Sequence, residues 1–217
     1  MRQIRPYRTV GGARRALDNG GRFYNLFTKA GDNVVEGVEL ARAAGVYSSD
    51  AMAFLYFEMA LMDLPDEDKA EVLSLLAPDL RAQLEAKRPW VLPPSRVESE
   101  GRTGLPAIVT GYPYLVEDKS QLRGFVVMVA PMIMMVPIVD EFDVYELFDT
   151  PDRAYPRTLL ATVRGSKRLD GSRIRFGGAI KELRFEDKPS RQHGLYLEAA
   201  YYTPLQELGA AGTGLAP

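Results

Sequence analysis

The sequence of 217 residues contains no cysteine, one histidine and one tryptophan. Without cysteine there are no disulfide bonds, no thiolate metal sites and no cysteine nucleophile. This composition is typical of a cytoplasmic protein, and it is equally compatible with an exported protein whose signal has been removed. With His193 as the sole histidine, good transition-metal ligands are few, so we expect no metal and no cofactor.

Long apolar runs are also scarce. The longest, GFVVMVAPMIMMVPIV at residues 124–139, contains Pro131 and Pro137 and is bracketed by Arg123 and Asp140. A membrane-spanning helix needs about 20 apolar residues and tolerates proline poorly. We therefore expect no transmembrane segment here, and instead two buried strands joined through a proline-containing turn.

Catalytic motifs are missing from the sequence. It has no G-x-S-x-G or S-x-x-K nucleophile motif, no phosphate-binding G-x-x-x-x-G-K-[ST] loop and no dinucleotide-binding G-x-G-x-x-G. His193 stands among polar and cationic neighbours, with no adjacent carboxylate to orient it as a base. We therefore predict no catalytic residue and favour a protein that is not an enzyme.

A change of pattern near residues 89–106 divides the chain. The segment before it reads as helices and the segment after it as strands, which predicts an α+β protein. We expect a small helical bundle over residues 1–88, a proline-rich junction over 89–106, an antiparallel β-barrel over 107–208 and a mobile tail over 209–217. The 46% hydrophobic residues and the net charge of −2 indicate a soluble globular chain with no overall attraction to nucleic acid.

Several residues mark the expected helix ends. Thr9 is a favourable N-cap for a short helix, and Asn33 with Glu36 three residues later resembles a capping box. Gly45 suits a helix C-terminus. Residues 51–64 are apolar on nearly every face, which predicts a central buried helix.

The second part is predicted to form strands over 107–116, 122–130, 142–148, 158–164, 172–185 and 195–202. Residues 167–171 are expected to turn one strand back on the next as a hairpin, and Gly177-Gly178 to bend the long strand. The run VRGSKRLDGSRIRFGGAIKEL resembles the central hairpin of an oligonucleotide/oligosaccharide-binding (OB) barrel. An SH3-like barrel or a small sandwich remains an alternative.

A basic stretch gives the first candidate site. Residues 157–191 hold ten bases and four acids. The residues we single out for binding a polyanion such as nucleic acid are Arg164, Lys167, Arg168, Arg173 and Arg175. The aromatic residues available for stacking are Phe176, Tyr196 and Tyr201. Residues 140–152 carry six acids and no base, so this segment could neutralise the patch.

The second candidate is the methionine-rich segment 131–137, which we expect to connect two strands as a loop. Its candidate contact residues for a partner are Met132, Met134 and Met135, because methionine adapts to irregular surfaces. Burial between the two halves is the favoured alternative.

Three functions follow in order of preference. The leading hypothesis is a non-enzymatic binding or assembly module that contacts a protein partner or its own copy. The alternatives are nucleic-acid or polyanion binding through a basic face of the barrel, and a carboxylate-based metal-dependent enzyme.

Overall fold

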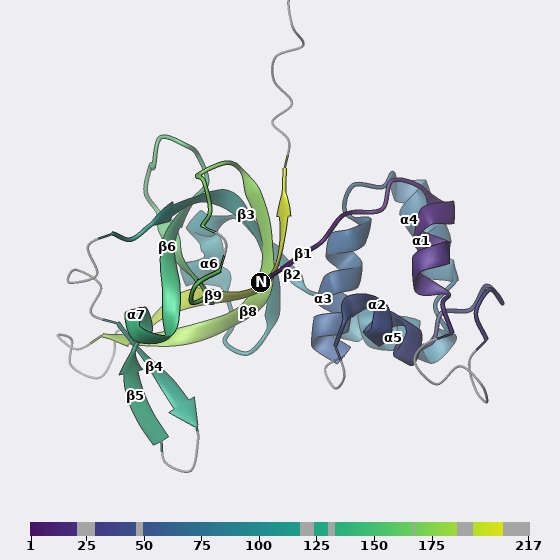
Figure 1. The fold of residues 1–217 in the computed structure, drawn as a ribbon, viewed down its shortest axis with the longest axis horizontal. Helices are drawn as coiled ribbons and strands as arrows, with labels where there is room; N and C mark the ends of the chain where they lie inside the picture. Colours follow the sequence, from purple (N-terminus) through teal and green to yellow (C-terminus); the bar gives the residue numbers. More distant parts are fainter. Residues whose placement is uncertain are drawn as a thin grey trace, which may run out of the picture.

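The structure is a computed structural model that describes residues 1–20, 29–46, 50–117, 124–129, 133–166, 168–185 and 193–205. Within these ranges, residues 124–129, 133–137, 139, 184–185 and 193 are described by their backbone alone. Helices precede a mixed β-sheet, which confirms the predicted α+β class (Figure 1). No helix in the described ranges is both long enough and apolar enough to cross a membrane.

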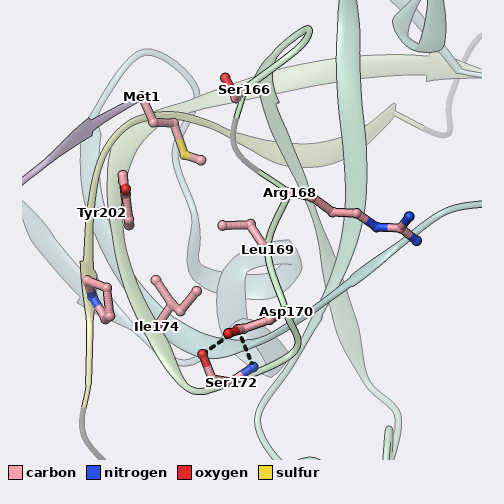
Figure 2. Close-up of a pocket in the computed structure, with 9 residues that line it drawn as sticks. Met1, Ser166, Arg168, Leu169, Asp170, Ser172, Ile174 and Tyr202 are labelled. Carbon is pink, nitrogen blue, oxygen red and sulfur yellow. Dashed lines mark hydrogen bonds between the residues drawn. The ribbon is translucent and has the colours of Figure 1, made fainter.

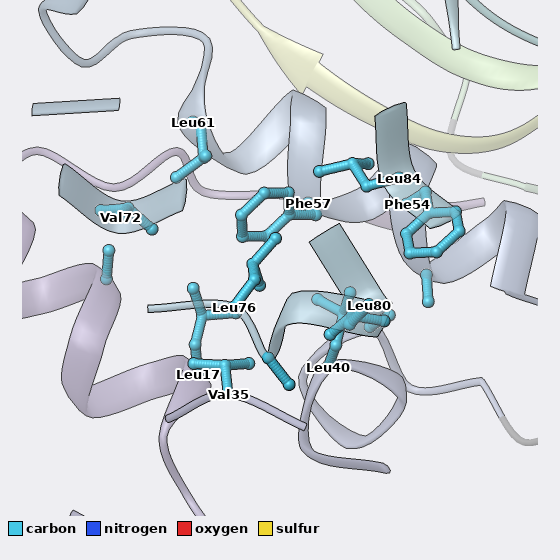
Figure 3. Packing of buried hydrophobic residues seen from close by; sticks show 14 of the residues in the cluster. Leu17, Val35, Leu40, Phe54, Phe57, Leu61, Val72, Leu76, Leu80 and Leu84 are labelled. Atoms are coloured by element: carbon cyan, nitrogen blue, oxygen red, sulfur yellow. The ribbon is translucent and has the colours of Figure 1, made fainter. Parts of the chain in front are cut away.

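The N-terminal helices share one apolar core (Figure 3). Phe54 and Phe57 lie at its centre, both essentially inaccessible to solvent. They belong to the helix that is apolar on all sides, because that helix contacts the other helices on one side and the sheet on the other. The helices are α1 (Val10–Leu17), α2 (Gly37–Ala44), α3 (Asp50–Leu61), α4 (Asp66–Ser74) and α5 (Pro78–Ala86).

Two of the three predicted helix ends are confirmed. The Thr9 side chain accepts a hydrogen bond from the Gly12 N–H at 3.1 Å, and Gly45 ends α2 in the left-handed conformation with φ 70°. The capping box predicted at Asn33 and Glu36 is wrong by one turn: the pair is Glu36 and Glu39. Asn33 adopts φ 66°, which places it in the turn before the helix.

The strands form one connected sheet. They are β1 (Arg2–Gln3), β2 (Trp90–Leu92), β3 (Pro106–Leu115), β4 (Gly124–Val129), β5 (Ile133–Pro137), β6 (Phe142–Phe148), β7 (Arg157–Val163), β8 (Ile174–Phe185) and β9 (His193–Pro204). The junction between the two halves contains β2, a 3₁₀ turn at Pro94–Arg96 and the short helix α6 (Val97–Glu100), whose Val97 is fully buried.

The strand pairings return to their starting point. β3 pairs with β6, β6 with β7, β7 with β9, β9 with β8, and β8 with β3. We call these strands the strand ring. β3, β6 and β7 lie side by side in chain order and β8 returns beside β3, which is the Greek-key arrangement. The interior of the ring is filled by apolar side chains that include Val109, Tyr145 and Phe176.

The predicted hairpin between the strands on either side of residues 167–171 is wrong. β7 and β8 do not pair, because β9 lies between them, parallel to β7 and antiparallel to β8. Both edges of β7 are therefore occupied, by β6 and β9. At Gly177-Gly178, where a bend was predicted, the register of β8 against β9 shifts between the two residues.

The apolar run at residues 124–139 forms two strands, as predicted. β4 and β5 pair antiparallel from Phe125 with Pro137 to Val129 with Ile133. The helix α7 (Ile138–Glu141) follows directly. The prediction that the methionine-rich segment is a loop is wrong, because Ile133–Pro137 forms strand β5 and pairs with β4. This β-hairpin projects from the strand ring on the side away from the helices (Figure 1).

The helical half and the sheet share a small apolar cluster. Leu55 and Met59 of α3 contact Ile108 of β3 and Tyr201 of β9 within it. Arg2 in β1 adds polar contacts, since its guanidinium donates to the carbonyl oxygens of Ala43 and Ala44 at the end of α2. A cation at a helix C-terminus is favourable, so these contacts hold the two halves together.

Candidate anion-binding cleft

A cleft of about 690 Å³ lies where the segment after β1 passes the start of β8 and the end of β9. Its lining includes Arg5, Arg8 and Arg173, together with Asp63 and Thr203. We call it the arginine cleft. Asp63 comes from the helical half. Arg5 and Arg8 lie in the segment between β1 and α1, Arg173 directly precedes β8, and Thr203 is in β9.

Two anchors position Arg5 and Arg8. The Ile4 N–H donates to the Tyr202 carbonyl at 2.8 Å, and the Tyr7 N–H donates to the Ala60 carbonyl at 2.8 Å. Ile4 is buried against the sheet and Tyr7 is half-buried against the helices. The arginine that follows each anchor is exposed, so both face the cleft.

Arg173 comes from the opposite wall. It directly precedes β8, and its carbonyl accepts a hydrogen bond from the Leu205 N–H at 3.0 Å. Ile174 pairs with Pro204 in the next register position. These backbone contacts fix the start of β8 beside the end of β9 and leave the Arg173 side chain exposed.

The arginine cleft is positively charged. Within the described part of the chain, the guanidinium groups of Arg5, Arg8 and Arg173 have no hydrogen-bond or ion-pair partner. The acid in the lining, Asp63, is bound by Arg175 with an Nη1–Oδ1 distance of 3.0 Å. Arg175 offsets Asp63, so the charge of the three lining arginines is not cancelled locally, and this favours anions.

Arg175 itself lies beneath the cleft surface. Its side chain is 13% exposed, and its Nε is buried without a hydrogen-bond partner in the described residues. Its charge is balanced by Asp63, whose carboxylate it holds in place, while Arg173 is the member of the predicted set that lines the cleft directly.

The other predicted basic residues lie elsewhere. Arg164 is exposed and donates to the Asp140 carbonyl at 2.7 Å. Arg168 forms an exposed ion pair with Glu117 at 3.3 Å, a type of contact that contributes little to stability. Lys167 lies outside the described residues. Of the four predicted basic residues that the structure describes, Arg173 lines the cleft, and Arg175 reaches it only through its ion pair with Asp63.

The three aromatic residues expected to stack on a ligand are buried. Phe176 is in the interior of the strand ring, and Tyr196 and Tyr201 lie in clusters on its outer surface. Burial raises the pKa of both tyrosines. The prediction of stacking through these residues is wrong, because strands with apolar residues on both faces are covered on both faces.

Several carboxylates of the acidic segment 140–152 bind groups within the protein. Asp143 accepts a hydrogen bond from the Gly165 N–H at 2.8 Å and Asp149 accepts one from the Ser95 N–H at 3.0 Å. Glu146 forms an ion pair with Arg157. In the described ranges no three histidine, aspartate or glutamate side chains gather closely enough to hold a metal ion. These carboxylates mainly fix turns and one strand pair.

A smaller pocket of about 190 Å³ adjoins the arginine cleft at the end of the strand ring, and the two share Pro204. We call it the end pocket. Leu169 points into it towards Tyr202 and Ile174, whereas the Arg168 side chain extends away (Figure 2). Asp170 fixes the rim by accepting hydrogen bonds from the N–H and hydroxyl of Ser172, at 3.1 and 2.6 Å (Figure 2).

A third hollow, of about 510 Å³, continues on the other side. It shares Arg168, Leu169 and Asp170 with the end pocket and is further lined by Tyr114 and Arg153. We call it the tyrosine pocket. The arginine cleft, the end pocket and the tyrosine pocket therefore follow one another around one end of the strand ring.

Arg5 and Arg8 were not selected from the sequence as site residues. The available signal was charge, since residues 1–29 hold seven bases against one acid. That signal does not reveal that the first residues pair with residues 201–202 at the far end of the chain. Of the methionine candidates, Met132 lies outside the described residues, and Met134 and Met135 are described by backbone alone, within β5.

The fold and the cleft define an α+β protein with an arginine-lined cleft at one end of its strand ring. No protein-family model matches the chain, and no curated protein matches it either.

Proposed function

We propose that this protein is a non-enzymatic binding protein whose arginine cleft holds a phosphate-bearing polyanion. The observation that carries the proposal is the convergence of Arg5, Arg8 and Arg173 on one cleft without side-chain partners in the described part of the chain. Planar guanidinium groups bind phosphate through paired hydrogen bonds.

An OB-like barrel is the scaffold that we propose for this site. The cyclic strand pairing, the Greek-key order and the bulge in β8 support it. A two-layer sandwich would leave free edges in each sheet, so the cyclic pairing favours a barrel. Such barrels often bind oligonucleotides or oligosaccharides, although fold alone does not specify a ligand.

The proposal is tested by fluorescence anisotropy of a labelled mixed-sequence oligonucleotide at increasing salt. Three phosphate contacts give a slope of about −2 in the logarithm of the binding constant against the logarithm of salt concentration. Arg5→Glu and Arg173→Glu are expected to weaken binding at least tenfold and to reduce that slope.

Arg15→Glu is the matched control. Arg15 is an exposed arginine on α1 with no side-chain partner among the described residues, so the substitution changes the total charge equally. If Arg15→Glu weakens binding as much as Arg173→Glu, the attraction is diffuse and the cleft is not the site. If the unsubstituted protein does not bind the oligonucleotide or polyphosphate at low salt, the proposal fails.

A second candidate function is assembly with a protein partner or a second copy, and β5 favours it. β5 is at the end of the sheet's pairing path, pairs only with β4 among the described strands, and consists of five apolar residues, IMMVP. An apolar strand with an unpaired edge is a template for pairing with another chain.

Light scattering tests the assembly proposal. Met134→Lys and Met135→Lys are compared separately, because consecutive strand residues point to opposite faces. An assembly that pairs through the edge of β5 and also covers one of its faces is expected to dissociate with one of these variants and to persist in high salt. Val38→Lys, at a residue on α2 that is 56% exposed, is the control. A chain that is monomeric at every concentration excludes self-assembly.

A further inference from the structure

The tyrosine pocket places the guanidinium groups of Arg153 and Arg168 in one lining with the Tyr114 ring, which belongs to a cluster of aromatic rings. The Arg153 guanidinium carbon lies 3.9 Å from the centre of the Tyr114 ring. Phe148 makes edge-to-face contacts with Tyr114 on one side and Tyr155 on the other, with ring centres 5.9 and 5.8 Å apart. Phe148 is buried and fixes the two tyrosines at the surface.

Tyr155 is the exposed member of this cluster. It is 72% exposed, the largest exposed fraction among the apolar and aromatic side chains that the structure describes as exposed. Arg157 lies near its ring, with the guanidinium carbon 5.4 Å from the ring centre. A large, exposed aromatic ring held by a buried ring beneath it offers a flat surface to a ligand.

Arg153 is held in a costly backbone conformation. Its φ of 59° is in the left-handed region, which few non-glycine residues adopt. The conformation directs the guanidinium onto the Tyr114 ring, and the Tyr114 hydroxyl donates to the Pro151 carbonyl at 2.8 Å in the same loop. Backbone outliers of this kind occur preferentially at binding sites.

The end pocket lies between this pocket and the arginine cleft. The end pocket shares Arg168, Leu169 and Asp170 with the tyrosine pocket and Pro204 with the arginine cleft. The arginine cleft presents three arginines. On the far side of the end pocket, the tyrosine pocket presents the Tyr114 ring with the Arg153 guanidinium, and its acidic lining residues are Glu117, which pairs with Arg168, and Asp170. Single-stranded nucleic acids are bound by this combination of a basic groove and stacking surfaces.

We infer that the ligand is a single-stranded nucleic acid. Its phosphates lie in the arginine cleft, and an unpaired base stacks on the Arg153 guanidinium at the tyrosine pocket or on the exposed Tyr155 ring, which Phe148 links to Tyr114. This inference rests on the proposed polyanion function and specifies its ligand class. An unpaired base is required because the faces of bases within a duplex are already stacked on their neighbours.

The test uses the full chain and four labelled or competing probes: a single strand, the same strand with abasic sites, its duplex, and inorganic polyphosphate. Tyr155→Ala is expected to weaken binding of the single strand about five- to a hundred-fold and to leave the abasic strand and polyphosphate unchanged. Arg153→Gly keeps the left-handed backbone while removing the guanidinium, and is expected to act in the same direction.

Val163→Ala is the control, since Val163 is 60% exposed in β7 and lies outside the three hollows. If Arg173→Glu weakens all probes and neither Tyr155→Ala nor Arg153→Gly weakens any, the polyanion function stands and this inference falls. The inference also falls if the duplex binds as tightly as the single strand. If polyphosphate and oligonucleotide both fail to bind, the proposed function falls as well.

Discussion

Arg175 of β8 forms an ion pair with Asp63, the residue two positions after α3, with 3.0 Å between Nη1 and Oδ1. The two residues are 112 positions apart and belong to different halves of the chain. Because the Arg175 side chain is 13% exposed and Asp63 is 46% exposed, this pair lies at the boundary between interior and solvent. It links the two halves directly below the arginine cleft.

Asp63→Asn is expected to strengthen polyanion binding. The amide keeps an acceptor oxygen for Arg175 but removes the negative charge that lines the cleft. We expect about a twofold or greater gain in affinity at low salt, and a loss of about 1 kcal/mol in the free energy of unfolding. Anisotropy and urea titrations measure the two effects. An equal gain for Asp79→Asn on α5 would show that only total charge matters.

Gly177→Ala is expected to destabilise the contact between α3 and β8. A Cβ at residue 177 would lie 2.3 Å from Sδ of Met59 and 3.2 Å from Cδ1 of Leu55. Overpacking of this kind costs about 1–3 kcal/mol, which urea unfolding resolves. In a Met59→Ala background, Gly177→Ala is expected to cost less, because the contact with Sδ is removed. Gly11→Ala, with 3.8 Å to its nearest neighbour, is the control and is expected to stabilise α1.

Glu39 predicts a pH dependence of stability. It is fully buried, and its carboxylate accepts hydrogen bonds from the N–H groups of Gly20 and Glu36. Burial raises the pKa of Glu39 more than these hydrogen bonds lower it. The folded chain therefore holds the carboxyl proton of Glu39 more tightly than the unfolded chain does. The contribution of protonated Glu39 to the free energy of unfolding is fully present below the unfolded pKa of roughly 4.3, and it is lost as pH rises through the folded pKa.

Glu39→Gln tests this pH dependence. The amide keeps one acceptor oxygen in place of two, which costs about 1–3 kcal/mol. The free energy of unfolding of Glu39→Gln is expected to fall below that of the unsubstituted protein most at acidic pH. This difference is expected to shrink as pH rises, because only the glutamate titrates. Urea unfolding at a series of pH values measures it. A deficit that grows with pH would mean that the pKa of Glu39 is lowered.

Trp90, the only tryptophan, reports on the sheet. It pairs with Ala107 and packs on the interior of the strand ring, with the Arg102 guanidinium carbon 5.0 Å from its ring centre. We expect its fluorescence and the far-ultraviolet circular dichroism of the helices to change together in urea, because Leu55 and Met59 join the two cores. Two separate transitions would show that the predicted segments 1–88 and 107–208 unfold independently.

Local patterns predicted the elements well. The strand expected at 142–148 has those bounds in the structure, and Thr9 and Gly45 end their helices as expected. The register of β8 shifts at Gly177-Gly178 for a local reason too, because two glycines within an alternating strand favour a bulge. These features depend on residues close together in the sequence, so the sequence alone suffices to find them.

Pairing between distant segments was not predictable in the same way. The turn residues between β7 and β8 favoured a hairpin, but their sequence contains no information about β9, which occupies that position. The short strands β1 and β2 have too few residues to show alternation. β1 pairs parallel with β9 at the far end of the described chain, and β2 pairs parallel with the nearby β3.

In the candidate site, too, the sequence predicted what depends on local composition and missed what depends on contacts between distant segments. Arg173 was identified because the surrounding stretch is rich in bases, and it does line the cleft. Arg175 is in the same stretch, yet Asp63 binds it, and nothing near Asp63 in the sequence indicates this partner. Tyr155 was not selected because its exposure and its contact with Phe148 depend on how the loop after β6 folds back.

The pairing of β1 with β9 has a consequence for synthesis on the ribosome. Gln3 and Tyr202 are neighbours in the sheet although they are 199 positions apart. The helices can collapse as soon as they emerge, because their contacts are closer in sequence. The strand ring closes, and Arg5 reaches the opposite wall of its cleft, only after β9 has been translated. A nascent chain stalled before that strand would thus hold an assembled helical half beside an incomplete binding site.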